Sequence, residues 1–175
     1  MAERPENPAG PYIANPKPTE LERGAMISTL KHFPARLRAA VEGLTPDQLK
    51  LKYRNWTIQQ IVHHLADSHI NAYVRFKLTL TETQPTIKPY DESRWSALQE
   101  PQTTDIQVSL QLLDALHHRW IRVLENLHEQ DFLHTYFHPE YKTVVSLGEA
   151  LGVYAWHCKH HLAQIELVRK EMVKN

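Results

Sequence analysis

Histidine stands out in this sequence, with 12 occurrences among 175 residues. His157 and His161 are four residues apart in a segment of helical periodicity, so they lie one turn apart on the same side of the helix. They fall within or at the edge of its apolar face, where a core ordinarily holds leucine or valine. Two imidazoles at this spacing can chelate a metal ion. The alternative is that two buried histidines hydrogen-bond to other side chains.

A third ligand is needed for a stable site, and another segment of helical periodicity offers His63, His64 and His69. On a helical wheel, His69 falls inside the apolar stripe and His63 lies nearly opposite it. His64 lies beside the stripe, in a polar column that also contains Asn71. His64 facing a polar cleft is therefore the best candidate for the third ligand. The alternative is that the column is a solvated face.

Long amphipathic helices must position these histidines. Thr57 and Ser146 are each followed three residues later by glutamine or glutamate, the capping-box pattern of a helix start. Pro34 is expected to kink the first helix or to divide it into two pieces. The expected helices cover residues 19–43, 57–83, 105–127 and 146–174. In the third of them, the residues expected to point inward are Val108, Leu112, Ala115, Leu116, Trp120, Val123 and Leu127.

The connections between these helices are too long for a minimal bundle. Residues 84–103 contain three prolines and are expected to form a long connection, with a short helical piece around 95–98. Residues 131–145 are expected to be irregular, with a short strand over 141–145. Residues 45–48 resemble the capped start of a short turn or helix. The sequence thus predicts an all-α fold, a four-helix bundle with long inter-helix connections.

The domain organisation expected is a proline-rich arm over residues 1–18 and a single metal-binding bundle over residues 19–175. Lys plus Arg and Asp plus Glu number 20 each, so the surface is not built to neutralise phosphates, and nucleic acid is excluded as a partner. No apolar run approaches the roughly 20 residues that span a bilayer. The one cysteine, Cys158, allows no intrachain disulfide. With no secretory signal at the N-terminus, these features favour a cytoplasmic protein.

Two motifs resemble those of the DinB-like metalloprotein superfamily. The segment that begins at Trp56 places His64 eight residues later and follows it with leucine, as in the first motif of that family. The closing motif has ligands at its first and fifth positions, which are His157 and His161 here. Ala163 departs from the glycine that many members carry, but a methyl group in mid-helix puts none of the ligands in doubt.

Two further segments, residues 68–78 and 86–92, resemble the YfiT-type branch of that superfamily more narrowly. The resemblance covers nearly the whole chain from about Pro11 onward. It implies a four-helix bundle, often a homodimer, with one nickel or zinc ion held by three histidines. Members of the branch are described as metal-dependent hydrolases, and other members of the superfamily use low-molecular-weight thiols.

Three neutral imidazoles leave a divalent ion with its full charge and an open coordination position, which favours catalysis over a closed structural site. Such an ion can activate water for hydrolysis, or bind a thiol and deliver a thiolate to an electrophile. We expect a metal-dependent hydrolase of a small-molecule substrate. The alternatives are a low-molecular-weight-thiol S-transferase, similar to bacillithiol transferases, and a non-catalytic metal-binding protein.

Further residues are candidates for assisting the chemistry. Asn71 and Arg75 lie on the same helix face as the third ligand, and Arg75 could hold a substrate carboxylate. Asp67 could orient a ligand, and Gln164 could hydrogen-bond a metal-bound water or act as a polar spacer. Glu92 is a candidate general base on the resemblance alone. Each has a plain alternative as a solvated or structural side chain.

Overall fold

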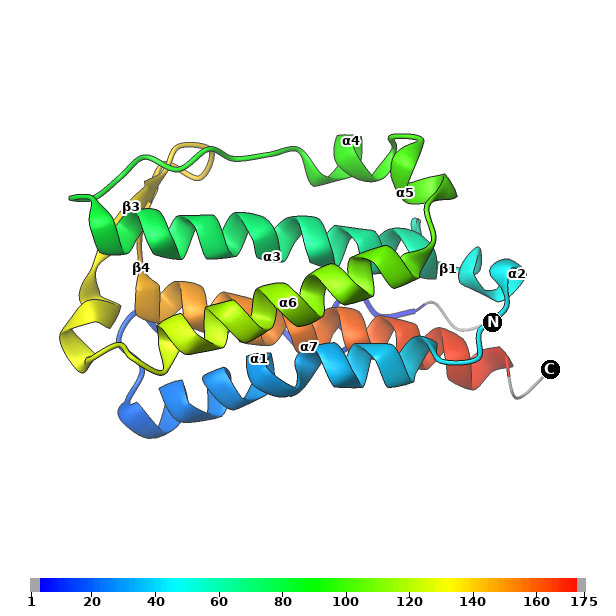
Figure 1. Cartoon of the computed structure of the whole chain (residues 1–175), viewed down its shortest axis with the longest axis horizontal. Coiled ribbons are helices and arrows are strands. Elements are labelled where there is room, and N and C mark those ends of the chain that lie inside the picture. Colours follow the sequence, from blue (N-terminus) through cyan, green and yellow to red (C-terminus); the bar gives the residue numbers. More distant parts are fainter. Residues whose placement is uncertain (1–3, 173–175) are drawn as a thin grey trace.

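The computed structural model describes residues 4–172. Its long helices confirm the predicted all-α four-helix bundle with long connections (Figure 1). In the described part of the chain, no helix is both long and apolar enough to cross a membrane. The bundle helices are α1 (Glu20–Val41), α3 (Ile58–Thr81), α6 (Ile106–Leu124) and α7 (Leu147–Met172).

The arrangement of the four helices places partners from distant parts of the sequence side by side. α1 packs against α6 and α7, and α3 packs against the same two helices, so α1 lies diagonally across the bundle from α3. The colours of Figure 1 show that α1 and α7 run in one direction and that α3 and α6 run in the other. Side chains of α3 and α7 therefore meet across an antiparallel contact in the interior.

The helix starts follow the predicted capping chemistry. At α3, the Thr57 hydroxyl accepts from the Gln60 N–H at 3.1 Å, and the Gln60 side chain accepts from the Thr57 N–H at 3.0 Å. At α7, the Ser146 hydroxyl accepts from the Glu149 N–H at 3.1 Å. It also donates to the carbonyl of Pro16 in the N-terminal arm at 2.8 Å. These bonds fix where α3 and α7, the two helices that carry the candidate ligand histidines, begin.

Pro34 does not divide the first helix, because α1 is continuous over Glu20–Val41. Proline has no N–H, so the carbonyl of Leu30, four residues earlier, loses its usual partner within the helix. That carbonyl instead accepts a hydrogen bond from Nδ1 of His117 on α6, at 2.8 Å. The bond between helices offsets part of the roughly 3 kcal/mol that an interior proline costs.

The inward face predicted for α6 is wrong in part. Trp120 is fully buried as expected, but Val108 and Leu112 are 56% and 41% exposed. Apolar residues occur on more than one side of this helix, and the side that packs inward carries His117, whose two ring nitrogens both find partners there. The buried residues of α6 are Ile106, Ser109, Leu110, Leu113, His117, Trp120, Ile121 and Leu124.

Short elements fill the connections between the long helices. The predicted helical piece in the second connection appears as α4, and the predicted strand pairs as β4 with β3 in an antiparallel hairpin. The short hairpin of β1 and β2, whose strands have two residues each, was not predicted. The short elements are α2 (Pro46–Leu49), β1 (Lys52–Tyr53), β2 (Trp56–Thr57), α4 (Glu92–Ser96), α5 (Glu100–Thr103), the 3-10 helix η1 (Glu129–Leu133), β3 (Thr135–His138) and β4 (Thr143–Ser146).

The described part of the proline-rich arm lies against α7. The indole N–H of Trp156 donates to the carbonyl of Gly10 at 2.8 Å. Gly148 is needed at the start of α7, because a Cβ there would come within 2.8 Å of Cδ of Pro18. Residues 1–3 of the predicted arm, and residues 173–175 beyond the observed end of α7, lie outside the described residues.

Candidate metal centre

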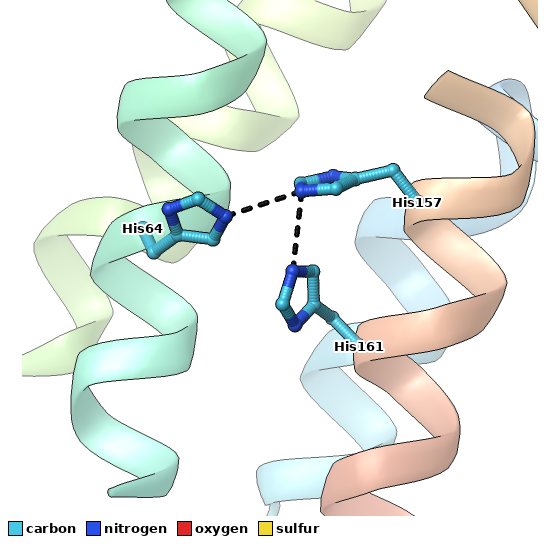
Figure 2. A group of neighbouring side chains, drawn as sticks. All are labelled: His64, His157 and His161. Carbon is cyan, nitrogen blue, oxygen red and sulfur yellow. Dashed lines mark hydrogen bonds between the residues drawn. The ribbon is translucent and has the colours of Figure 1, made fainter. Parts of the chain in front are cut away.

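The three predicted ligand histidines meet inside the bundle. His64 comes from α3, and His157 and His161 come from successive turns of α7, with their rings turned toward one another (Figure 2). Nε2 of His157 lies 3.1 Å from Nε2 of His64 and 3.1 Å from Nε2 of His161. One nitrogen of each ring lies within 4.8 Å of the other two.

The spacing of these nitrogen atoms fits a shared cation. Nδ1 of His161 donates to Oε1 of Gln164 at 2.8 Å, so Nε2 of the neutral ring carries a bare lone pair. Nε2 of His157 faces this lone pair and also His64, and a single N–H cannot point well at both. Tetrahedral nitrogen ligands about 2.05 Å from zinc are about 3.3 Å apart, close to the separations seen here.

Burial keeps these rings in the neutral form that binds metal. It lowers the pKa of His64 to about 3, with a smaller contribution from His160. The pKa values of His157 and His161 are lowered well below the usual histidine range, first by burial and then by the neighbouring imidazoles. An imidazole that stays neutral does not need to release a proton before it coordinates an ion.

Trp56 on β2 closes one side of the histidine group. Its indole and the His64 ring form a T-shaped pair, with ring centroids 4.6 Å apart. The same indole lies parallel to the His161 ring, at 6.4 Å between centroids. Because β2 leads directly into α3, the short hairpin places this tryptophan beside candidate ligands from both helices.

Gln164 contacts a candidate ligand directly, which differs from the two roles considered from the sequence. Its side-chain oxygen accepts from Nδ1 of His161, and its Nε2 donates to Nε2 of His160 at 2.8 Å. The amide therefore fixes both the tautomer and the orientation of the His161 ring. Its position one turn after a ligand was the signal in the sequence.

A hollow of about 330 Å³ reaches the ring of His161 from the surface. Its walls come from the N-terminal arm, the β1–β2 hairpin, the start of α4 and α7, and they include Trp56 and Glu92. Four other hollows, of about 380 to 660 Å³, are larger, but none of the three histidines lines them. The hollow beside His161 is therefore the route by which a small molecule would approach.

Of the predicted catalytic residues, the structure brings Glu92 to this hollow. Glu92 is an exposed residue, but the pKa of its carboxyl group is raised above the usual value, first by partial burial of that group. The nearby carboxylates of Glu140 and Asp91 act in the same direction. Glu92 also lines a second hollow, of about 430 Å³, together with Tyr141. A carboxyl group with a raised pKa at the hollow that His161 lines is suited to proton transfer.

The other polar candidates on α3 have partners outside this hollow. The Asn71 side-chain amide donates to the Asp67 carbonyl one turn earlier, at 2.8 Å. Nη1 of Arg75 donates to the hydroxyl of Tyr154 at 3.2 Å. Burial raises the pKa of Asp67 to about 6, with Glu100 adding to the effect. Within residues 4–172, no hydrogen bond joins Asp67 to His64.

On the helical wheel, His63 lies opposite the apolar stripe of α3, a position typical of a solvated side chain. The structure shows otherwise. His63 is buried, with Nδ1 2.8 Å from the Ser109 hydroxyl and Nε2 3.1 Å from the Thr104 carbonyl. The reason is that α5 and α6 cover this side of α3, so the helix is enclosed on more sides than one apolar stripe indicates.

Sequence reasoning did not assign a role to His69 or His117. Nε2 of His69 lies 3.3 Å from Nδ1 of His157, and Nδ1 of His69 lies 2.7 Å from Nε2 of His117. Both rings are almost completely buried. The signal available in the sequence was a histidine inside the apolar stripe of α3, where a leucine would cost less to bury.

Comparison with known proteins agrees with this picture. The pattern of the DinB superfamily matches residues 29–165. YfiT of Bacillus subtilis is 44% identical over 167 residues, which cover 94% of each chain. A protein of Oceanobacillus iheyensis is 42% identical over 160 residues, or 90% of this chain and 92% of the relative. Both relatives are described as proposed metal-dependent hydrolases.

A solved structure of Bacillus subtilis YfiT superposes on this chain with a TM-score of 0.92 and 44% sequence identity, covering 95% of this chain and 97% of that one. That protein is described as having an unusual four-helix bundle topology. The helical bundle and its three converging histidines thus define a protein of the DinB type. More narrowly, the chain belongs to the YfiT-type family of the DinB superfamily.

Proposed function

We propose that this protein is a hydrolase of a small molecule that uses one divalent metal ion, nickel or zinc, held by His64, His157 and His161. The observation that carries the proposal is the convergence of three neutral imidazoles, one of which, that of His161, lines a hollow that opens to solvent. The description of the relatives as proposed metal-dependent hydrolases supports it.

The chain itself supplies the ligands and their alignment. When bound, a divalent ion with three protein ligands keeps an open position and lowers the pKa of a coordinated water toward about 7, which provides a nucleophile at neutral pH. Trp56 packs against two of the ligand rings and limits their movement. Gln164 holds the His161 ring so that Nε2 points toward the other ligands.

Glu92 is the proposed general base. Its carboxylate lines the hollow beside His161, and its raised pKa brings it closer to neutral pH than an ordinary glutamate. It would accept a proton from the attacking water and return it to the leaving group. Roles for Asn71 and Arg75 in binding the substrate stay predictions, because their observed partners lie elsewhere.

The reaction class is tested by loading the purified protein with zinc or nickel and screening esters and amides, and then thiols with electrophiles. Hydrolysis that disappears in His161→Ala, together with the metal, supports the proposal. Glu92→Gln should lower kcat by roughly 10²- to 10⁴-fold with the metal content unchanged. Conjugation of a low-molecular-weight thiol without hydrolysis would instead establish the S-transferase alternative.

Two further expectations stay predictions. The homodimer rests on the family resemblance, and analytical ultracentrifugation of the full chain would test it. The cytoplasmic location rests on composition alone, including the single cysteine.

A further inference from the structure

Two buried histidines and one partly buried histidine form a hydrogen-bonded row that ends at a metal-ligand candidate. Nδ1 of His157 lies 3.3 Å from Nε2 of His69, whose Nδ1 lies 2.7 Å from Nε2 of His117. Nδ1 of His117 in turn donates to the carbonyl of Leu30 at 2.8 Å. We call His157, His69 and His117 the histidine relay. Its members and its carbonyl anchor come from α7, α3, α6 and α1, so the row crosses the whole bundle.

The carbonyl at the end of the relay sets the direction of every bond in it. A carbonyl only accepts, so Nδ1 of His117 carries the hydrogen and Nε2 of the neutral ring is left as an acceptor. Nδ1 of His69 must then be the donor to His117, which leaves Nε2 of His69 as an acceptor. By the same step Nδ1 of His157 is the donor to His69, and Nε2 of His157 is a bare lone pair.

The anchor is available because of a proline. In an unbroken helix the Leu30 carbonyl would accept from the N–H four residues later, but that residue is Pro34, which has none. The proline therefore leaves an unpaired acceptor in the middle of α1, at the level of His117. One missing hydrogen bond within α1 thus supplies the fixed point from which the tautomer of a residue on α7 is set.

The surroundings of the relay keep it neutral and rigid. His69 and His117 are 0% and 2% exposed. The rings of Phe33 and Trp120 each lie within 6.0 Å of both, centroid to centroid. Burial lowers the pKa of both histidines, that of His117 to about 4. Each of their four ring nitrogens has a partner, so the row is fully satisfied without any charge.

We propose that the relay is a positioning device, in which His69 and His117 hold His157 in the tautomer and orientation that present Nε2 to the metal. The proposal rests on the metal site of the proposed function, but its first consequence concerns the metal-free protein. Without a fixed partner on Nδ1, the hydrogen of a neutral imidazole can occupy either nitrogen, and on Nε2 it would block the metal-binding position.

The direct test is the tautomer of His157 in the metal-free protein, read from the ¹⁵N chemical shifts of its ring. The full chain should show the hydrogen on Nδ1, and His69→Phe should shift a substantial fraction to Nε2. The zinc affinity of His69→Phe, measured by competition with a chelator, should fall by roughly 10- to 100-fold. Removing the far end of the row with His117→Phe should change the tautomer in the same direction, with a smaller loss of affinity.

Two other variants separate positioning from packing. In His69→Gln the side-chain oxygen can occupy the place of Nε2 and accept from His157, so most of the affinity should return. His63→Phe is the matched control, since His63 is also buried and hydrogen-bonded on α3 but contacts no ligand through its ring nitrogens. It should change stability and leave both the tautomer and the zinc affinity as they are.

The outcomes separate this proposal from the proposed function. A parent protein with the hydrogen of His157 on Nε2, or relay variants with an unchanged tautomer and affinity, would overturn the relay. Equal losses of affinity in His63→Phe and His69→Phe would do the same, because they would point to packing alone. A parent that takes up neither zinc nor nickel would overturn the metal site instead, whatever tautomer the NMR spectrum shows.

Discussion

His63 and His64 are neighbours in the sequence and both are buried, but their surroundings differ in kind. The two nitrogens of His63 meet oxygen atoms, from the Ser109 hydroxyl and the Thr104 carbonyl. Nε2 of His64 meets another imidazole nitrogen, that of His157, at 3.1 Å. The first environment satisfies a neutral histidine completely, whereas in the second the Nε2 atoms of three imidazoles converge, and those of His157 and His161 carry lone pairs that face each other. Burial alone therefore does not mark a metal ligand, but the convergence of ring nitrogens does.

The largest effect on zinc affinity is expected for His157→Ala, with His63→Ala as its control. The first variant removes a ligand and the end of the relay. Zinc binds four-ligand sites with about 10–16 kcal/mol, or about 3 kcal/mol for each ligand, so affinity should fall on the order of 100-fold or more. Chelator competition measures it. His63→Ala should bind zinc as the parent does, and similar losses in both variants would remove the distinction between the two environments.

Acid should destabilise the metal-free protein through its buried neutral histidines. The folded pKa of His117 is about 4, below the usual value of about 6.5, because the ring is buried. Between these values the unfolded chain binds a proton that the folded chain does not, so stability rises with pH. The loss on acidification is about 1.4 kcal/mol per pH unit for each such histidine. Urea unfolding from pH 6.5 to 5 measures the slope, which should be shallower in His117→Phe. A flat profile would contradict this assignment.

A smaller effect is expected for Gln164→Leu. The substitution removes the acceptor for Nδ1 of His161 but leaves all three ligands in place, so zinc affinity should fall by roughly 10-fold. The matched control is Gln59→Leu, because Gln59 is a partly buried glutamine that donates to the Thr104 carbonyl. If both glutamine variants bind zinc like the parent, the His161 ring needs no orienting amide.

The smallest effect on zinc affinity is expected for His63→Phe. The Ser109 hydroxyl would lose its partner, and the Thr104 carbonyl would keep only the hydrogen bond from Gln59. The free energy of unfolding should therefore fall by about 1–3 kcal/mol. The rise in melting temperature on adding zinc should nevertheless equal that of the parent, since the affinity is unchanged. A smaller rise would mean that His63 supports the metal site.

The features that sequence alone could predict were those encoded by local spacing. The capping boxes and the apolar repeats predicted the long helices, and the motifs identified the family. The i, i+4 spacing of His157 and His161 indicated a shared face, and the structure brings both to His64. What remained hidden depends on contacts between helices. The wheel of α6 has apolar residues on several sides, so it could not show that the side with His117 packs inward.

Pro34 shows the same limit in one residue. The local rule correctly states that proline removes an N–H, and from this the sequence predicted a kink or a break. The observed result is that the Leu30 carbonyl, which has no N–H partner four residues later, accepts from His117, 87 residues away. Nothing near Pro34 in the sequence points to that partner. The relay is therefore a product of the tertiary fold.

The central claim is that three converging imidazoles hold one divalent ion. The most direct test is elemental analysis of the purified, untagged protein beside His161→Ala, after both have been offered nickel and zinc. The account predicts about one equivalent of metal per chain in the parent and little in the variant. No metal in either protein, or equal amounts in both, would contradict it.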